Sequence, residues 1–257
     1  MGFGDQLLGS GLAKGAAARG RRIAFGNGIK IIWDQHSAEV FRGNPNIVAP
    51  GSECADRIDW IPFYKGHRLY NRQAGDRWVW NMDFHAIPGE MYFDDAERKA
   101  GARFGKGFVI IEPQSAPWKS VAANKDWGRA KFQAVADRLK AAGHKVAQFQ
   151  SDKGSPVLAG VTALKTTSFR DAVAVLSHAA IYIGSEGGLH HAAAAVGIPA
   201  VVLFGGFIPP SVTGYTTHAN LTGGAEACGS LKPCSHCRKA MEAISVEEVI
   251  EEARERL

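Results

Sequence analysis

A carboxylate, a glycine pair and two adjacent imidazoles follow one another in the segment SEGGLHHAAAA, which begins at Ser185. An apolar run, AIYIG, precedes this segment, and a second run, PAVVLFG, follows it. Free backbone N–H groups at a helix start attract anions, and glycines let a phosphate approach the backbone closely. Glu186 would then accept hydrogen bonds from a sugar hydroxyl, while His190 or His191 would donate one to a phosphate. A tight turn in which one histidine caps the helix explains the same spacing equally well.

Asp5 is the acidic residue of the glycine-rich N-terminal segment GFGDQLLGSG. The segment has neither the G-x-G-x-x-G dinucleotide pattern nor the Gly-Lys-Ser/Thr ending of a Walker loop. A carboxylate at such a helix start can act as a general base toward an incoming hydroxyl. It can also serve only as a helix N-cap, and on the residues alone the cap is the more common outcome.

The segment QSAPWKSVAANKDW holds further candidates for binding an anion. Lys119 and Lys125 are suitable point charges for a diphosphate, and Ser115 offers a hydrogen-bond donor. Solvated loop lysines are the more common alternative.

Three cysteines, Cys228, Cys234 and Cys237, lie close together in the segment CGSLKPCSHC. Their spacing would suit a structural zinc if a fourth ligand, Cys54 or a histidine, came near. Reduced thiols within the protein core are the alternative. Four cysteines in all are too few for a disulfide scaffold.

The second half of the chain alternates apolar runs with amphipathic segments. The apolar runs predict strands at 107–113, 144–150, 180–184 and 199–205. Helices are predicted at 128–143, 168–179, 189–197 and 244–257. Ser168 and Ser245 each precede an acidic residue by three positions, the spacing of a capping box. This alternation indicates a parallel sheet built from right-handed βαβ units.

The first half gives fewer signals. Its clearest predictions are one helix and two strands, at 5–20, 21–26 and 30–34. No order can be assigned within 50–105. The polar, glycine-containing segment at 97–107 predicts a boundary there, with an N-terminal domain of residues 1–104 and a C-terminal domain of residues 105–257.

Composition limits the class of protein. The chain has 257 residues, a net charge of +5 and a pI near 9.0, which favours an anionic partner. No apolar run approaches the length of a membrane span, and the N-terminus has the wrong order of charges for a secretory signal. We therefore expect a cytoplasmic protein.

These motifs, in their order, resemble glycosyltransferase family 9, the ADP-heptose:lipopolysaccharide heptosyltransferases and their relatives. The family's G-D-x-L loop is matched by GDQLL, and its K-x-W segment by KDW at 125–127. Its D-[ST]-G-x-x-H-x-A-A-A motif with the following strand is matched by EGGLHHAAAAVGIPAVVLFG. A late cysteine-containing segment and ISVEEV also have counterparts. The resemblance covers the second half almost continuously, but only about the first 50 residues of the first half.

The resemblance implies an α/β fold of the GT-B type, in which two Rossmann-like domains with parallel sheets face a cleft, the N-terminal one shortened here. It implies an inverting, metal-independent mechanism that requires no catalytic cofactor. Asp5 would be the general base, and the donor would be held by Ser115, Lys125, Glu186, Gly187, Gly188, Leu189 and His191. Glu186 departs from the family, which usually has Asp there.

The implied function is transfer of a sugar from a nucleotide-diphosphate donor, ADP-heptose-like, to an acceptor hydroxyl of a lipopolysaccharide or other surface-glycan precursor. The expected partners are the nucleotide-sugar and an anionic glycan or glycolipid, with peripheral contact at the inner membrane. Two alternatives remain open at this point. One is a glycosyltransferase acting on a modified base in DNA, and the other is a non-catalytic module that binds sugar nucleotides.

Overall fold

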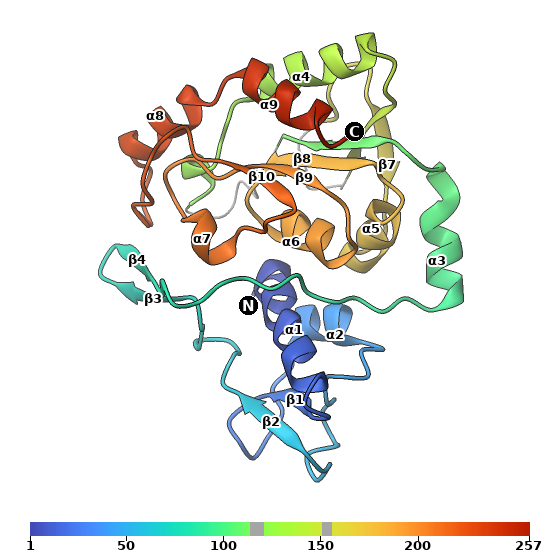
Figure 1. The fold of residues 1–257 in the computed structure, drawn as a ribbon, viewed down its shortest axis with the longest axis vertical. Helices are drawn as coiled ribbons and strands as arrows, with labels where there is room; N and C mark the ends of the chain where they lie inside the picture. The colour runs from blue at the N-terminus through green and yellow to red at the C-terminus, as the bar shows by residue number, and fades with distance from the viewer. Residues whose placement is uncertain (114–120, 151–155) are drawn as a thin grey trace.

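The computed structural model describes residues 1–113, 121–150 and 156–257, and Figure 1 shows an N-terminal part below a larger C-terminal part. A six-stranded parallel sheet forms the centre of the C-terminal part, in the order β10-β9-β8-β5-β6-β7. Its strands are β5 (Val109–Glu112), β6 (Val146–Gln150), β7 (Thr162–Lys165), β8 (Ile181–Ser185), β9 (Ala200–Leu203) and β10 (His218–Leu221). The strand order reverses between β5 and β8, and open parallel sheets bind ligands beyond the strand ends at such a point.

Helices cover both faces of this sheet. In Figure 1, α4 (Arg129–Ala141) and α9 (Val246–Arg254) lie on one face, and α5 (Phe169–Leu176) and α6 (Gly188–Ala195) on the other. Alternate residues of β5 serve the two faces: Val109 and Ile111 belong to the α4 side and Ile110 to the other. This two-sided burial explains why the strands are continuous apolar runs. The predicted α/β alternation is confirmed.

The helix starts were predicted from serines, and those caps are confirmed. The hydroxyl of Ser168 accepts the Asp171 N–H at 3.0 Å, and that of Ser245 accepts the Glu248 N–H at 3.0 Å. A full capping box would also need the Asp171 carboxylate to accept the Ser168 N–H. That carboxylate pairs with the Arg103 guanidinium at 2.8 Å. The remaining short helices of this part are η2 (Ala122–Asn124), α7 (Pro210–Thr213) and α8 (Ser235–Ala243).

The N-terminal part is small, as predicted. Its helices are α1 (Phe3–Ala17), α2 (Gln35–Phe41), α3 (Asp95–Gly101) and η1 (Ala102–Phe104). A parallel pair, β1 (Arg22–Phe25) and β2 (Ile58–Ile61), and an antiparallel hairpin, β3 (Asn71–Ala74) and β4 (Arg77–Trp80), complete it. The boundary predicted at residue 104 coincides with the end of η1, and β5 begins at Val109; the division into two domains stays a prediction.

The strand predicted at 30–34 is wrong. Only a single antiparallel bridge forms there, between Ile31 and Gly26. Ile31 instead turns into a small apolar cluster with Ala24 and Val48. The Asp34 side chain then accepts the Ser37 N–H at 2.9 Å and begins α2, which ends any extended segment.

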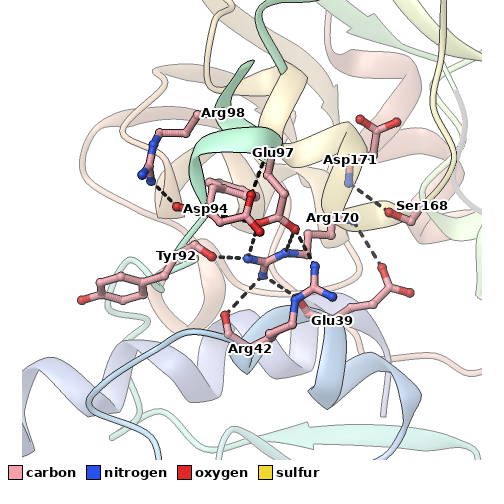
Figure 2. A network of polar contacts seen from close by, with 10 residues as sticks. Glu39, Arg42, Tyr92, Asp94, Glu97, Arg98, Ser168, Arg170 and Asp171 are labelled. Carbon is pink, nitrogen blue, oxygen red and sulfur yellow. Dashed lines mark hydrogen bonds and ion pairs between the residues drawn. The ribbon is translucent and has the colours of Figure 1, made fainter. Parts of the chain in front are cut away.

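The two parts contact each other directly. Helix α1 lies against α6, and α3 lies against α5, so one hydrophobic cluster contains residues of both parts. Buried Arg170 on α5 connects them through polar contacts, shown in Figure 2. Its guanidinium donates to both carboxylate oxygens of Glu97, at 2.6 and 2.9 Å, and to the carbonyl of Glu39 at 2.9 Å. The carbonyl of Tyr92 accepts a further bond.

None of the helices in the described residues is both long and apolar enough to cross a membrane.

Candidate functional site

The carboxyl end of β8 lies at the reversal point of the sheet. Two residues, Glu186 and Gly187, connect β8 to α6, so the predicted strand–loop–helix arrangement is confirmed. Gly187, Gly188 and Leu189, at the start of α6, are partly exposed. The hydroxyl of Ser185 donates to the carbonyl of Lys125 at 2.9 Å and fixes the neighbouring loop to this turn.

Lys125 and Glu186 form a buried ion pair at this turn. The Lys125 ammonium contacts the carboxylate and also donates to the Glu186 carbonyl at 3.3 Å. The two side chains are 13% and 6% exposed. Burial alone would raise the pKa of Glu186, but the nearby Lys125 charge and the histidines hold it well below its usual range. Glu186 is therefore a carboxylate, and among the described residues its carboxylate and carbonyl are the hydrogen-bond acceptors of the Lys125 ammonium.

His190 is fully buried and serves the structure of the turn. Its Nδ1 accepts the Gly187 N–H at 3.3 Å, so Nε2 carries the proton and donates to the Thr213 carbonyl at 3.1 Å. Burial, together with the neighbouring His191, lowers its pKa well below the usual value. The ring is therefore neutral, and neither nitrogen is left for a phosphate. Of the two candidate histidines, His190 takes the capping role.

His191 connects the ion pair to a second buried group. Its Nε2 lies 3.5 Å from the Glu186 carboxylate, and its Nδ1 lies 2.8 Å from the Tyr215 hydroxyl. Burial raises the pKa of Tyr215, which keeps that hydroxyl protonated. A continuous polar chain thus runs from Lys125 through Glu186 and His191 to Tyr215.

Asp5 lies in the first turn of α1 with 9% of its surface exposed. Its carboxylate accepts the Gly2 N–H at 2.7 Å. The N-cap of α1 is therefore Gly2, and the predicted alternative of Asp5 as the N-cap is wrong, because Asp5 lies inside the first turn. It also accepts the Tyr70 hydroxyl and meets the Arg68 guanidinium at 3.3 Å. Burial and the Asp5 charge raise the pKa of Tyr70 well above its usual value. Asp5 is therefore held by more than a helix cap.

The starts of α1 and α6 meet at Gly4. A Cβ atom on Gly4 would lie 2.9 Å from His191 Cδ2 and 3.4 Å from Gly188 Cα. Next to it, the rings of Phe3 and Phe169 stack with centroids 4.0 Å apart. The positive ends of two helix dipoles therefore converge beside the buried carboxylates. The charge of Glu186 also contributes to the raised pKa of Tyr70, so the Asp5 and Glu186 sites are electrostatically connected.

Several site residues were not predicted, and two predictions are not placed. Arg68, Tyr70 and Tyr215 came from segments without a chemical motif in the sequence. Ser115 and Lys119 lie outside the described residues.

The thiols of Cys228, Cys234 and Cys237 lie within 4.8 Å of one another, as their spacing predicts. The Sγ of Cys228 is 3.9 Å from that of Cys234 and 3.2 Å from that of Cys237. Cys54 is exposed and does not belong to this group within the described ranges, so its predicted part as a fourth ligand is wrong. The ring of His236 points its Nε2 to the Glu226 carbonyl, at 2.8 Å.

Solved structures resemble this fold. A crystal structure of a family 9 glycosyl transferase from Veillonella parvula DSM 2008 has a TM-score of 0.52 and 18% identity, over 66% of this chain and 54% of its own. Escherichia coli ADP-heptose lps heptosyltransferase II has a TM-score of 0.48 and 18% identity, and the match covers 65% of this chain and 52% of its own. The iron-containing dodecameric glycosyltransferase TibC from enterotoxigenic E. coli H10407 has a TM-score of 0.46 and 17% identity, and the match covers 70% of this chain and 50% of its own.

The chain spans about half the length of these structures. The Veillonella structure supports the predicted GT-B architecture with a shortened N-terminal domain. No curated protein shows significant sequence similarity to the chain. The sequence model of glycosyltransferase family 9 (heptosyltransferase) matches residues 78–244, which is more than half of the chain. Together with the strand–loop–helix turn at Glu186, this match shows that the chain belongs to glycosyltransferase family 9.

Proposed function

We propose that the protein is an inverting glycosyltransferase that uses a nucleotide-diphosphate sugar of the ADP-heptose class. The observation that carries this proposal is the convergence of α1 and α6, which brings Asp5 near the Lys125–Glu186 pair through Gly4. Membership of family 9, described as heptosyltransferase, supports the choice of donor.

In the proposed reaction, an acceptor hydroxyl attacks the anomeric carbon of the donor sugar from the face opposite the diphosphate. The new carbon–oxygen bond forms as the bond to the diphosphate oxygen breaks, and the configuration inverts. Asp5 takes the proton of the attacking hydroxyl. The buried contacts from Tyr70 and Arg68 fix the direction of the carboxylate for this step.

The leaving nucleoside diphosphate gathers negative charge as the bond breaks. The Lys125 ammonium would donate to it, together with the backbone N–H groups of Gly188 and Leu189 at the start of α6. The Gly187 N–H is already bonded to His190 Nδ1, so Gly187 would contribute by letting the diphosphate approach the backbone. Glu186 contacts the Lys125 ammonium, and His191 contacts the Glu186 carboxylate in turn. We also propose that the Ser115 hydroxyl donates a hydrogen bond to the same diphosphate. This neutralisation by protein groups is why we propose metal-independent transfer.

We propose a lipopolysaccharide or other surface-glycan precursor as the acceptor, with the enzyme in the cytoplasm at the inner face of the membrane. The net charge of +5 suits an acceptor that carries phosphates or carboxylates. A nucleic-acid acceptor is not favoured by the family.

The donor assignment can be tested by thermal unfolding with ADP, UDP and GDP. A ligand at a hundred times its Kd adds roughly 2.7 kcal/mol to the stability of the folded state, so ADP should raise the Tm most. Lys125→Ala should remove this shift, whereas Lys145→Ala, which changes an exposed lysine directly before β6, should keep it. Equal shifts with all three nucleotides, or none, would contradict an adenine-specific donor site.

We also propose a structural zinc at Cys228, Cys234 and Cys237. Two of the thiols accept backbone hydrogen bonds in the manner of metal-bound thiolates: Cys228 from the Ser230 N–H at 3.5 Å, and Cys234 from the amides of Cys237 and His236. Hydrogen bonds from backbone N–H groups lower the pKa of Cys234, and the bond from the Cys237 N–H contributes most. Burial raises the pKa of Cys237, an effect that a bound cation would oppose.

Metal content of the purified protein tests the zinc proposal. Elemental analysis should find one zinc per chain, and Cys234→Ser should lose it together with part of the thermal stability. Absence of metal, combined with no uptake of added Zn²⁺ by the reduced protein, would leave the thiols as ordinary core residues.

A further inference from the structure

Asn124 is a buried polar side chain near the proposed donor site whose amide makes three hydrogen bonds. It is 1% exposed and precedes Lys125 directly. Its Nδ2 donates to the carbonyls of Ser230 and Lys232, both at 2.9 Å, and its Oδ1 accepts the Cys234 N–H at 2.9 Å. All three bonds therefore go to one segment, residues 228–237, which we call the cysteine loop.

The cysteine loop also reaches Lys125 from a second direction. The Cys228 N–H donates to the Gly206 carbonyl at 2.9 Å, and the Gly229 N–H donates to the Phe207 carbonyl at 3.0 Å. The Lys125 ammonium lies 5.1 Å from the centroid of the Phe207 ring. The loop thus fixes both the residue before Lys125 and the aromatic face beneath its charge.

Two backbone contacts within the described residues also hold Lys125. It follows the short helix η2, and its backbone N–H donates to the Ala122 carbonyl at 3.0 Å. The bond from Ser185 to its carbonyl is the connection to the sheet. A buried amide that bonds three backbone groups of another segment is a strong constraint, because each group would be unsatisfied without it.

We propose that Asn124 is a positioning residue that connects the cysteine loop to Lys125 and sets where the ammonium meets the donor diphosphate. This inference rests on the proposed function, in which Lys125 binds that diphosphate. Asn124 itself does not touch the ligand. Its effect on binding must therefore pass through Lys125.

A double-mutant cycle measures this dependence, with ADP as the probe and calorimetric Kd as the readout. Lys125→Ala should weaken ADP binding about 10- to 100-fold, the loss of one hydrogen bond to a charged group. Asn124→Ala should weaken it about 5- to 10-fold in the native background. In the Lys125→Ala background the same change should have less than about a twofold effect, because coupled residues are not additive.

Two further variants separate positioning from loss of stability. Asn44→Ala removes another buried asparagine, whose amide contacts Glu90 in the N-terminal part, and should lower the Tm without changing the Kd of ADP. Asn124→Ser replaces the amide with a hydroxyl that can still form a hydrogen bond, and it is the milder replacement if the alanine variant fails to fold. It should show the same dependence on Lys125.

The outcomes are distinct for the two proposals. An unchanged Kd in Asn124→Ala or Asn124→Ser, or equal effects with and without Lys125, would overturn the positioning role and leave the donor site intact. Wild-type ADP affinity in Lys125→Ala would overturn both proposals.

Discussion

Glu186 has two charged or polar partners on opposite sides. One carboxylate oxygen contacts the Lys125 ammonium, and the other lies 3.5 Å from His191. All three side chains are at most 13% exposed, so water compensates poorly for a lost partner. Removing one member of a buried ion pair leaves the other charge uncompensated.

Glu186→Gln should therefore destabilise the protein by about 3–5 kcal/mol, because the Lys125 charge stays buried without its carboxylate. Urea unfolding at pH 7 measures this loss. Glu247→Gln is the control, since Glu247 pairs with Arg138 on the surface and should leave the urea midpoint unchanged. Equal midpoints for both variants would show that the pair near α6 is not the buried contact described above.

The residues of this site divide by how they can be predicted. Glu186, the glycine pair and His191 occur together in the sequence because one turn needs them at fixed spacing. Tyr70 and Arg68 reach Asp5 from more than sixty residues away, and no local period marks them. Only tertiary contact brings them to the carboxylate, so the sequence indicated Asp5 as a candidate base without its partners.

At the scale of elements, the contact between α1 and α6 depends on Gly4. The ring of His191 occupies the space that a side chain there would need. Gly15 lies in the same helix but faces solvent, where an added Cβ would meet only the end of Arg19 at 3.8 Å. One helix therefore contains a glycine that is required for close approach and one that is not.

Gly4→Ala should destabilise the protein by about 1–3 kcal/mol, because the methyl group pushes α1 away from α6. Gly15→Ala should stabilise it by about 0.5–1 kcal/mol, the ordinary gain of alanine over glycine inside a helix. Thermal unfolding of the two variants checks both signs. Stabilisation by Gly4→Ala would mean that the helices do not touch as described.

Elements with a clear period were predictable, and so were the serine caps of α5 and α9, but the cap at Asp34 was not. Helix α4 buries the four residues that its apolar spacing indicates: Phe132, Val135, Ala136 and Leu139. The segment at 30–34 has the β-branched and aromatic residues of a strand, yet Asp34 turns it into a helix start. A side-chain cap of this kind competes with strand pairing, and the apolar pattern alone does not reveal which succeeds.

At the scale of the whole molecule, Arg170 joins the two parts at α5 (Figure 2). Its partner Glu97 has a pKa lowered to about 2, chiefly by the hydrogen bond from Arg170. In the unfolded chain the pKa of a glutamate is about 4.3. The lowered value means that the pair stabilises the folded state fully above that pH and less as the pH falls toward 2.

Glu97→Gln should be less stable than the native protein at pH 7 and should lose less stability between pH 5 and pH 2. Urea midpoints across this range test the expected change in slope. Arg98→Met, on the same helix but 61% exposed in its side chain, should keep the native slope. A parallel pair of curves for Glu97→Gln and the native protein would contradict the proposed role of this contact.

The most direct measurement of the central claim compares Asp5→Asn with the native protein in two assays. The first is ADP released from ADP-heptose with truncated lipopolysaccharide as acceptor, and the second is the Kd of ADP. Loss of a general base should lower the rate about 10²- to 10⁴-fold, while the Kd stays within about twofold of the native value. A native rate in a variant that still binds ADP would contradict Asp5 as the base opposite the Lys125–Glu186 pair.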